Sequence, residues 1–112
     1  MIEKTVRDYL AEKLSVSVYM EVPEDPAESF VVLEKTGSGR ENMISSAVIT
    51  VQSYAGTKYG AAALNEAVKE AMDSLITLSG ISRSALNSDY DFTDPSTKRY
   101  RYQAVYDIVY YD

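Results

Sequence analysis

The sequence lacks the residue types on which most catalytic and metal sites depend. It contains no cysteine, no histidine and no tryptophan. Without cysteine there are no disulfides, no thiolate nucleophiles and no cysteine-bound zinc. Without histidine the chain also loses the commonest general base at neutral pH and the commonest metal ligand. These absences exclude most familiar catalytic constellations.

Positive charge is scarce as well. The chain has 17 acidic residues against 11 basic ones, which gives a formal net charge of -6 at pH 7. Proteins that follow a nucleic-acid backbone need a basic surface, because lysine and arginine neutralise phosphates. The single basic cluster, Lys98, Arg99 and Arg101, has Asp91, Asp94 and Asp107 close by in the sequence. We therefore expect no specific binding of nucleic acid.

Long apolar runs are also absent. No segment approaches the about 18 apolar residues of a membrane span, and the first residues do not form a signal peptide. The chain has 112 residues, of which 46% are hydrophobic and 25% charged, a balance typical of one globular domain spanning residues 1–112. We expect a cytosolic protein with no membrane partner.

What the chain has in excess is tyrosine, with ten tyrosines against two phenylalanines. A tyrosine ring supplies a large apolar area together with a polar hydroxyl. That combination is favoured on surfaces that are hydrated before assembly and buried afterwards. The composition thus directs attention to surfaces rather than to a catalytic pocket.

The periodicity of apolar residues predicts two helices and five strands. Ile2, Val6 and Leu10 are spaced as on one face of a helix, whereas residues 99–111 alternate with the period of a strand. The predicted elements are a helix at 2–14, strands at 15–21, 30–35 and 47–55, a helix at 57–78, and strands at 81–92 and 99–111. This order predicts an α+β fold, in which a mainly antiparallel sheet of about four to five strands carries two helices on one face.

The connection between the second and third predicted strands is unusually long. Gly37 and Gly39 interrupt the second strand, and the next clear strand begins at Ala47. Tight hairpins use about two to five residues, so a longer connection is either mobile or shaped by a partner. In the alternative interpretation, Met43 and Ile44 already begin the third strand. Both interpretations stay open at this point.

The last strand places several tyrosines on one face. Tyr100, Tyr102, Tyr106 and Tyr110 alternate along it. A buried hydroxyl without a partner costs about 1–3 kcal/mol, so these rings need partners or a place at the sheet margin. They either lie beneath the helices with their hydroxyls at the rim, or form part of an interface between subunits. We take them as interface-strand candidates.

Motifs for chemistry are incomplete. Gly37-Ser38-Gly39 lacks the lysine of a phosphate-binding loop, and Asp89, Asp91 and Asp94 lack the glycine and closing glutamate of a calcium loop. The serines have no neighbouring base that would activate them. We expect no catalytic residues, no metal, no cofactor and no enzymatic activity.

Several strings along the chain are similar to those of one protein family. They are Val18-Tyr19-Met20-Glu21-Val22-Pro23, Phe30-Val31-Val32-Leu33-Glu34-Lys35-Thr36-Gly37, Val51-Gln52-Ser53-Tyr54-Ala55, and Asp94-Pro95 followed by Arg99-Tyr100-Arg101-Tyr102-Gln103. With the order of the elements, they resemble the tail terminator proteins of long-tailed bacteriophages and prophages, also called tail completion, minor tail or neck proteins.

This resemblance implies a structural protein that forms a homohexameric ring on the finished end of the tail tube. The ring would stop polymerisation of the tail tube protein and present a surface to the head-completion or connector protein. DNA would pass through the ring without specific binding. The protein would assemble in the host cytoplasm and reside at the neck end of the virion tail.

The long connection is the segment that we expect to contact a partner or a neighbouring subunit. Its assembly-loop candidates are Lys35, Thr36, Gly37, Gly39, Arg40 and Glu41. The alternative is a small-ligand or regulatory binding module with a ferredoxin-like α+β sandwich, because such a layout hosts many functions.

Overall fold

The computed structural model describes residues 1–97 and 99–111, so Lys98 of the basic cluster lies outside the described residues. The described residues form two helices, a short 3-10 turn and five strands, with helices and strands in the predicted order. They are α1 (Ile2–Lys13), β1 (Ser17–Tyr19), β2 (Phe30–Glu41), β3 (Ile44–Ala55), α2 (Lys58–Asp73), η1 (Leu75–Thr77), β4 (Ile81–Asp91) and β5 (Tyr100–Tyr111).

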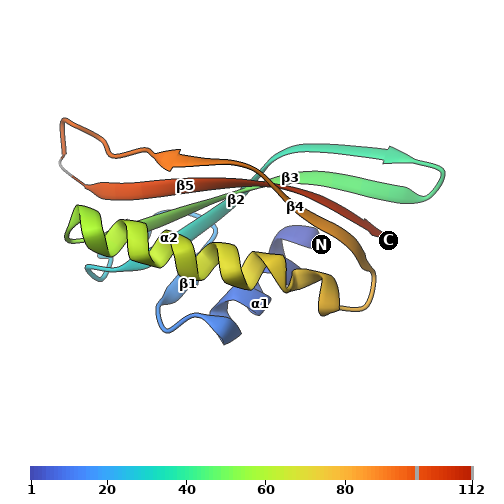
Figure 1. The fold of residues 1–112 in the computed structure, drawn as a ribbon, viewed down its shortest axis with the longest axis horizontal. Helices are drawn as coiled ribbons and strands as arrows, with labels where there is room; N and C mark the ends of the chain where they lie inside the picture. The colour runs from blue at the N-terminus through green and yellow to red at the C-terminus, as the bar shows by residue number, and fades with distance from the viewer. Residues whose placement is uncertain (98, 112) are drawn as a thin grey trace.

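The five strands form one sheet in the order β1-β2-β3-β5-β4. β1 pairs with β2 in parallel, and the other neighbouring strands pair antiparallel. Both helices lie on one face of this sheet, and the other face carries no helix (Figure 1). The predicted α+β fold is confirmed.

The second helix is shorter than its apolar pattern predicts. α2 begins after Thr57, whose hydroxyl oxygen accepts a hydrogen bond from the Gly60 amide at 2.9 Å. It ends at Asp73 rather than at residue 78, because the backbone tightens into the 3-10 turn η1. The tighter turn directs Leu75 into the core, where it is fully buried.

The predicted long loop between residues 36 and 46 is instead a β-hairpin. β2 runs to Glu41 and β3 begins at Ile44, so only Asn42 and Met43 form the turn. Both turn residues have positive φ, 51° and 67°, as a two-residue type I′ turn requires. Of the two interpretations of this segment, the one that begins the third strand early is correct for Ile44, whereas Met43 belongs to the turn.

The six assembly-loop candidates therefore lie in a strand and not in a loop. They are Lys35, Thr36, Gly37, Gly39, Arg40 and Glu41. The glycines do not break β2, because the strand has a bulge between Lys35 and Gly37. A Cβ atom at Gly39 would come within 3.0 Å of the Ser46 hydroxyl oxygen. The strand thus uses a glycine where the neighbouring strand approaches closely.

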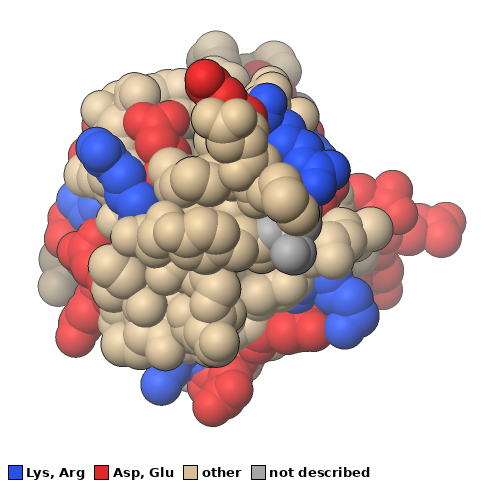
Figure 2. All heavy atoms as spheres, turned by 90° about the vertical axis from the view of Figure 1, so that its right-hand side faces the viewer, with Lys and Arg blue, Asp and Glu red and all other residues tan. Residues whose placement is uncertain are grey.

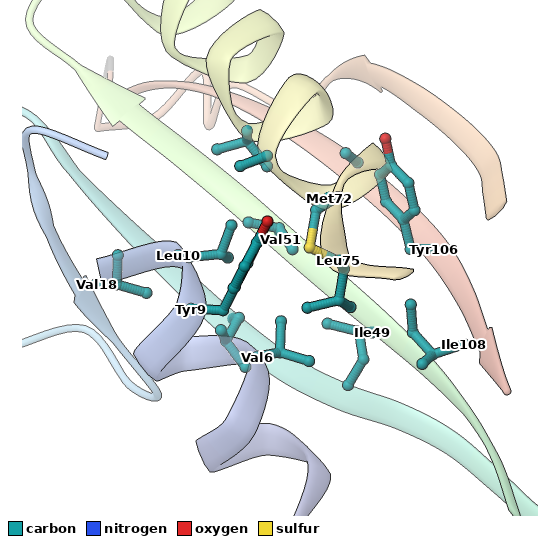
Figure 3. Close-up of a cluster of buried hydrophobic side chains, with 14 of the residues drawn as sticks. Val6, Tyr9, Leu10, Val18, Ile49, Val51, Met72, Leu75, Tyr106 and Ile108 are labelled. Carbon is teal, nitrogen blue, oxygen red and sulfur yellow. The ribbon is translucent and has the colours of Figure 1, made fainter. Parts of the chain in front are cut away.

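The main core lies between the helices and the sheet (Figure 3). α1 contributes Val6 and Leu10, and α2 contributes Val68 and Met72. The sheet contributes alternate residues of its strands, and the core members of β2, β3 and β5 are Val31, Leu33, Ala47, Ile49, Val51, Ala104, Tyr106 and Ile108. A second, smaller cluster formed by Phe30, Val32 and Tyr54 lies on the helix-free face.

Candidate assembly surfaces

The tyrosine face of the last strand is directed toward the helices. Tyr106 is fully buried, and its hydroxyl donates to the Lys69 carbonyl at 3.2 Å and to Asp73 Oδ1 at 3.1 Å. Burial, and the Asp73 carboxylate beside it, raise the pKa of the Tyr106 phenol. Tyr106, one of the interface-strand candidates, is therefore a core residue of the folded subunit.

The other three interface-strand candidates share this face but are less enclosed. Tyr110 is partly buried and packs against the main core. Tyr100 and Tyr102 are half-buried near the other end of β5. The structure thus brings the four tyrosines to the helix side of the sheet, with Tyr106 in the core and Tyr100 and Tyr102 at its margin.

The helix-free face carries a network that the sequence did not reveal. Phe30 of β2 stacks on Tyr54 of β3, with ring centroids 4.5 Å apart. The guanidinium of Arg101 lies over the Tyr54 and Phe92 rings, 5.6 and 4.6 Å from their centroids, and donates to the Tyr54 hydroxyl at 2.8 Å. These contacts join β2, β3 and β5 through a second aromatic cluster, in which Phe30 and Tyr54 are buried.

Amides extend this network across the sheet. Gln52 donates to Gln103 at 2.9 Å, and Gln103 in turn donates to the Tyr90 hydroxyl of β4. The Tyr54 hydroxyl donates to Gln52 at 3.1 Å, which connects the amides to the aromatic contacts. The only sequence signal for this face was the alternation of β5, whose second set of residues includes Arg101 and Gln103.

A polar cluster fixes α2 against β4. Lys69 Nζ lies 2.8 Å from Asp89 Oδ2, and Asn65 Nδ2 donates to the same oxygen at 3.0 Å. The hydrogen bond from Lys69 holds the pKa of the Asp89 carboxyl below its ordinary value, with Asn65 adding to the effect. The cluster locks the helix to one edge strand of the sheet.

Both edges of the sheet are open. Within the described residues, β1 covers β2 only along Phe30–Val32, so the part of β2 from Glu34 to Glu41 has no strand on its outer side. β4 forms the opposite edge and pairs only with β5. Unpaired edges expose backbone donors and acceptors, and they tend to pair with another chain.

The hairpin of β2 and β3 extends beyond the ends of both helices (Figure 1). The end of the molecule on that side has mostly uncharged residues at its centre and charged residues around its rim (Figure 2). The turn residue Met43 is 75% exposed, and Tyr111, which pairs with Ile44, is 59% exposed. Met1 and Tyr111 also line an open groove of about 470 Å³ at this end.

The described residues hold neither a metal-binding group nor a helix that could cross a membrane. Residues 1–97 and 99–111 contain no group of three or more acidic side chains placed to hold a metal ion. Among the same residues, no helix has the length and apolar character needed to cross a membrane.

Comparison with known proteins finds a likeness in fold. No protein-family model matches the chain, and no curated protein matches its sequence. Among solved structures, a chain from the virion of a native gene transfer agent particle matches with a TM-score of 0.71 and 17% sequence identity. The match covers 99% of the present chain and 95% of the other. The two chains therefore share a fold along their whole length.

Proposed function

We propose that this protein is a structural component of a phage-like virion. The observation that carries the proposal is the fold shared, over nearly all of both chains, with a chain from a gene transfer agent virion. The sequence strings that resemble tail terminators support the same assignment independently, because they come from the residues rather than from the backbone. The surfaces described above are those of an assembling protein, since they combine open edges with an exposed apolar end.

More specifically, we propose that the protein is a tail terminator. Its copies form a homohexameric ring that caps the tail tube, stops polymerisation of the tube protein, and offers its outer surface to the head-completion or connector protein. The ring assembles in the host cytoplasm and remains at the neck end of the virion tail. It performs no catalysis and needs no cofactor.

The binding-module alternative receives less support from the fold. A ferredoxin-like domain follows the order β-α-β-β-α-β. In this chain three strands, not two, stand between the helices. The order of elements thus differs from the ferredoxin-like order.

The experiment is an assay of self-assembly and of tube capping. The purified protein is examined by multi-angle light scattering and negative-stain electron microscopy, and then added to the polymerising tail tube protein of the same phage or prophage. We expect ring-shaped particles, and tubes that stop growing when the protein is present. A strict monomer that leaves tube growth unchanged at every concentration would refute the proposal.

A further inference from the structure

The two open edges of the sheet are complementary in direction. From β2 to β4 the strand order is β2-β3-β5-β4, and each neighbouring pair is antiparallel, so β4 runs antiparallel to β2. A second copy placed beside the first in the same orientation therefore brings its β4 next to β2 of the first copy, and these two strands run antiparallel. The helices of both copies then stay on the same face.

We propose that copies of this chain join edge to edge, with residues 83–90 of β4 in one copy pairing with residues 34–41 of β2 in the next. The inference rests on the proposed function and names the contact that would build the ring. Such a contact is head-to-tail, because each copy uses two different edges, and a head-to-tail contact generates a ring when the rotation between copies closes.

Complementary charges define the register. Glu41 on β2 and Arg83 on β4 both lie on the helix-free face, since Glu41 pairs with Ile44 and Arg83 with Val109 in the subunit. When Glu41 is placed opposite Arg83, Lys35 falls opposite Asp89 on the helix side. Lys35 and Asp89 lie on the helix side, because their side chains form ion pairs with Glu3 of α1 and Lys69 of α2, respectively. Both oppositely charged pairs are formed in one register.

The irregularities of the two edges also fit this register. β2 contains one extra residue, Thr36, between Lys35 and Gly37, and residues 83–90 of β4 contain one, Asn87, between Leu86 and Ser88. A bulge normally protects an edge, because a regular strand cannot pair across it. Here the two bulges fall at neighbouring positions. The one-residue shift that Thr36 introduces in β2 is therefore cancelled by the one-residue shift that Asn87 introduces in β4. Ser38 then faces Leu86, and both lie on the helix side.

The register also sets a stagger between copies. In the subunit, Lys35 is level with Leu86 through Ile49 of β3 and Tyr106 of β5. Pairing Lys35 with Asp89 displaces each copy by two ladder positions along the strand, about 7 Å, because Asn87 is the extra residue of the β4 bulge. A constant displacement between strands is what a sheet needs in order to close into a barrel. The edge contact therefore suits a ring whose inner wall is a continuous sheet.

Cross-linking tests the contact directly, because the native chain has no cysteine. The double variant Ser38→Cys and Leu86→Cys is oxidised and analysed by non-reducing gel electrophoresis. Within one subunit, two strands lie between these positions, a separation of about 14 Å that no disulfide spans. We expect a ladder of covalent oligomers from the double variant, no ladder from either single variant, and only dimers when the two single variants are mixed.

The matched control moves one cysteine to the other face of the sheet. In Ser38→Cys with Ala85→Cys the thiols lie on opposite faces, so the ladder should be absent. Rings in the microscope without a ladder from the Ser38 and Leu86 pair would overturn the edge contact while leaving the proposed function intact. Absence of both rings and ladder would overturn the edge contact and the proposed function together.

A charge exchange gives a second readout. Glu41→Arg and Arg83→Glu each place like charges opposite one another, and each should weaken self-association by about tenfold. The variant that carries both substitutions restores an opposite-charge pair and should recover most of the association. Glu12→Arg, an exposed position on α1, serves as the control. Additive losses in the double variant would contradict the register.

Discussion

Hydroxyl groups beneath α2 explain why several core positions of this protein are polar. Tyr106 donates to the Lys69 carbonyl, Ser84 to the Met72 carbonyl at 2.7 Å, and Tyr9 to the Ser74 carbonyl at 3.1 Å. The last four carbonyls of a helix, here those of residues 70–73, have no partner within the helix. The Ser84 hydroxyl bonds one of these, the Met72 carbonyl, while Tyr106 and Tyr9 add hydrogen bonds to the carbonyls just before and just after them.

Removal of one such hydroxyl should lower the free energy of unfolding. Tyr106→Phe keeps the ring but removes both hydrogen bonds, and we expect it to lower the free energy of unfolding by about 1–2 kcal/mol. Tyr102→Phe is the matched control, because Tyr102 is half-buried and its hydroxyl makes no hydrogen bond within the described part of the chain. Urea unfolding followed by circular dichroism measures both variants. Equal free energies of unfolding for the Tyr106→Phe and Tyr102→Phe variants would contradict a stabilising role of the Tyr106 hydroxyl.

At the scale of helices and strands, local sequence patterns were sufficient to predict most of the elements of the fold. The alternation of residues 99–111 and the apolar spacing of residues 2–14 predicted β5 and α1 to within a residue or so. The ends of β2 and α2 were not predictable in the same way. Gly37 and Gly39 read locally as a strand break, and only the pairing with β3 keeps them in the sheet. Likewise, the apolar residues after Asp73 continue the helical pattern, but the backbone there changes to the three-residue hydrogen-bond spacing of η1, from Thr77 to Ser74 and from Leu78 to Leu75.

The turn of the hairpin has a feature that stability alone does not favour. Met43 has a φ of 67°, and a type I′ turn is most stable with glycine at that position. Met43→Gly should raise the free energy of unfolding of the monomer by up to about 1 kcal/mol, because the positive φ then carries no side-chain penalty. Chemical denaturation checks this result.

Met43→Ala separates the backbone effect from the side-chain effect. It removes the exposed thioether but retains a side chain at positive φ, so the monomer should gain no stability. If the exposed methionine serves assembly, both variants should weaken tube capping equally. A loss of stability in Met43→Gly would show that the methionine side chain itself stabilises the turn.

At the scale of the whole molecule, the sequence could predict which surfaces would matter only in part. It indicated interfaces rather than a catalytic site, and it left open whether the tyrosine face of β5 is core or interface. That face became the core because both helices cover the same side of the sheet, which alternation within one strand does not specify. The open edges and the contacts of Arg101 with Tyr54 and Phe92 depend on strand order, and strand order is set by pairings distant in sequence.

The net charge of the molecule predicts how it behaves toward DNA. Each subunit carries a formal charge of -6, so a ring of several copies repels a phosphate backbone, and most strongly at low salt, where screening is weak. We expect no retardation of double-stranded DNA in a mobility-shift assay at low salt. A control variant replaces the exposed acids Glu12, Glu24, Asp25 and Glu70 with lysine, which changes the net charge by +8, from -6 to +2. The control should bind DNA in a salt-dependent manner, whereas tight binding by the unmodified protein would contradict a ring that lets DNA pass without holding it.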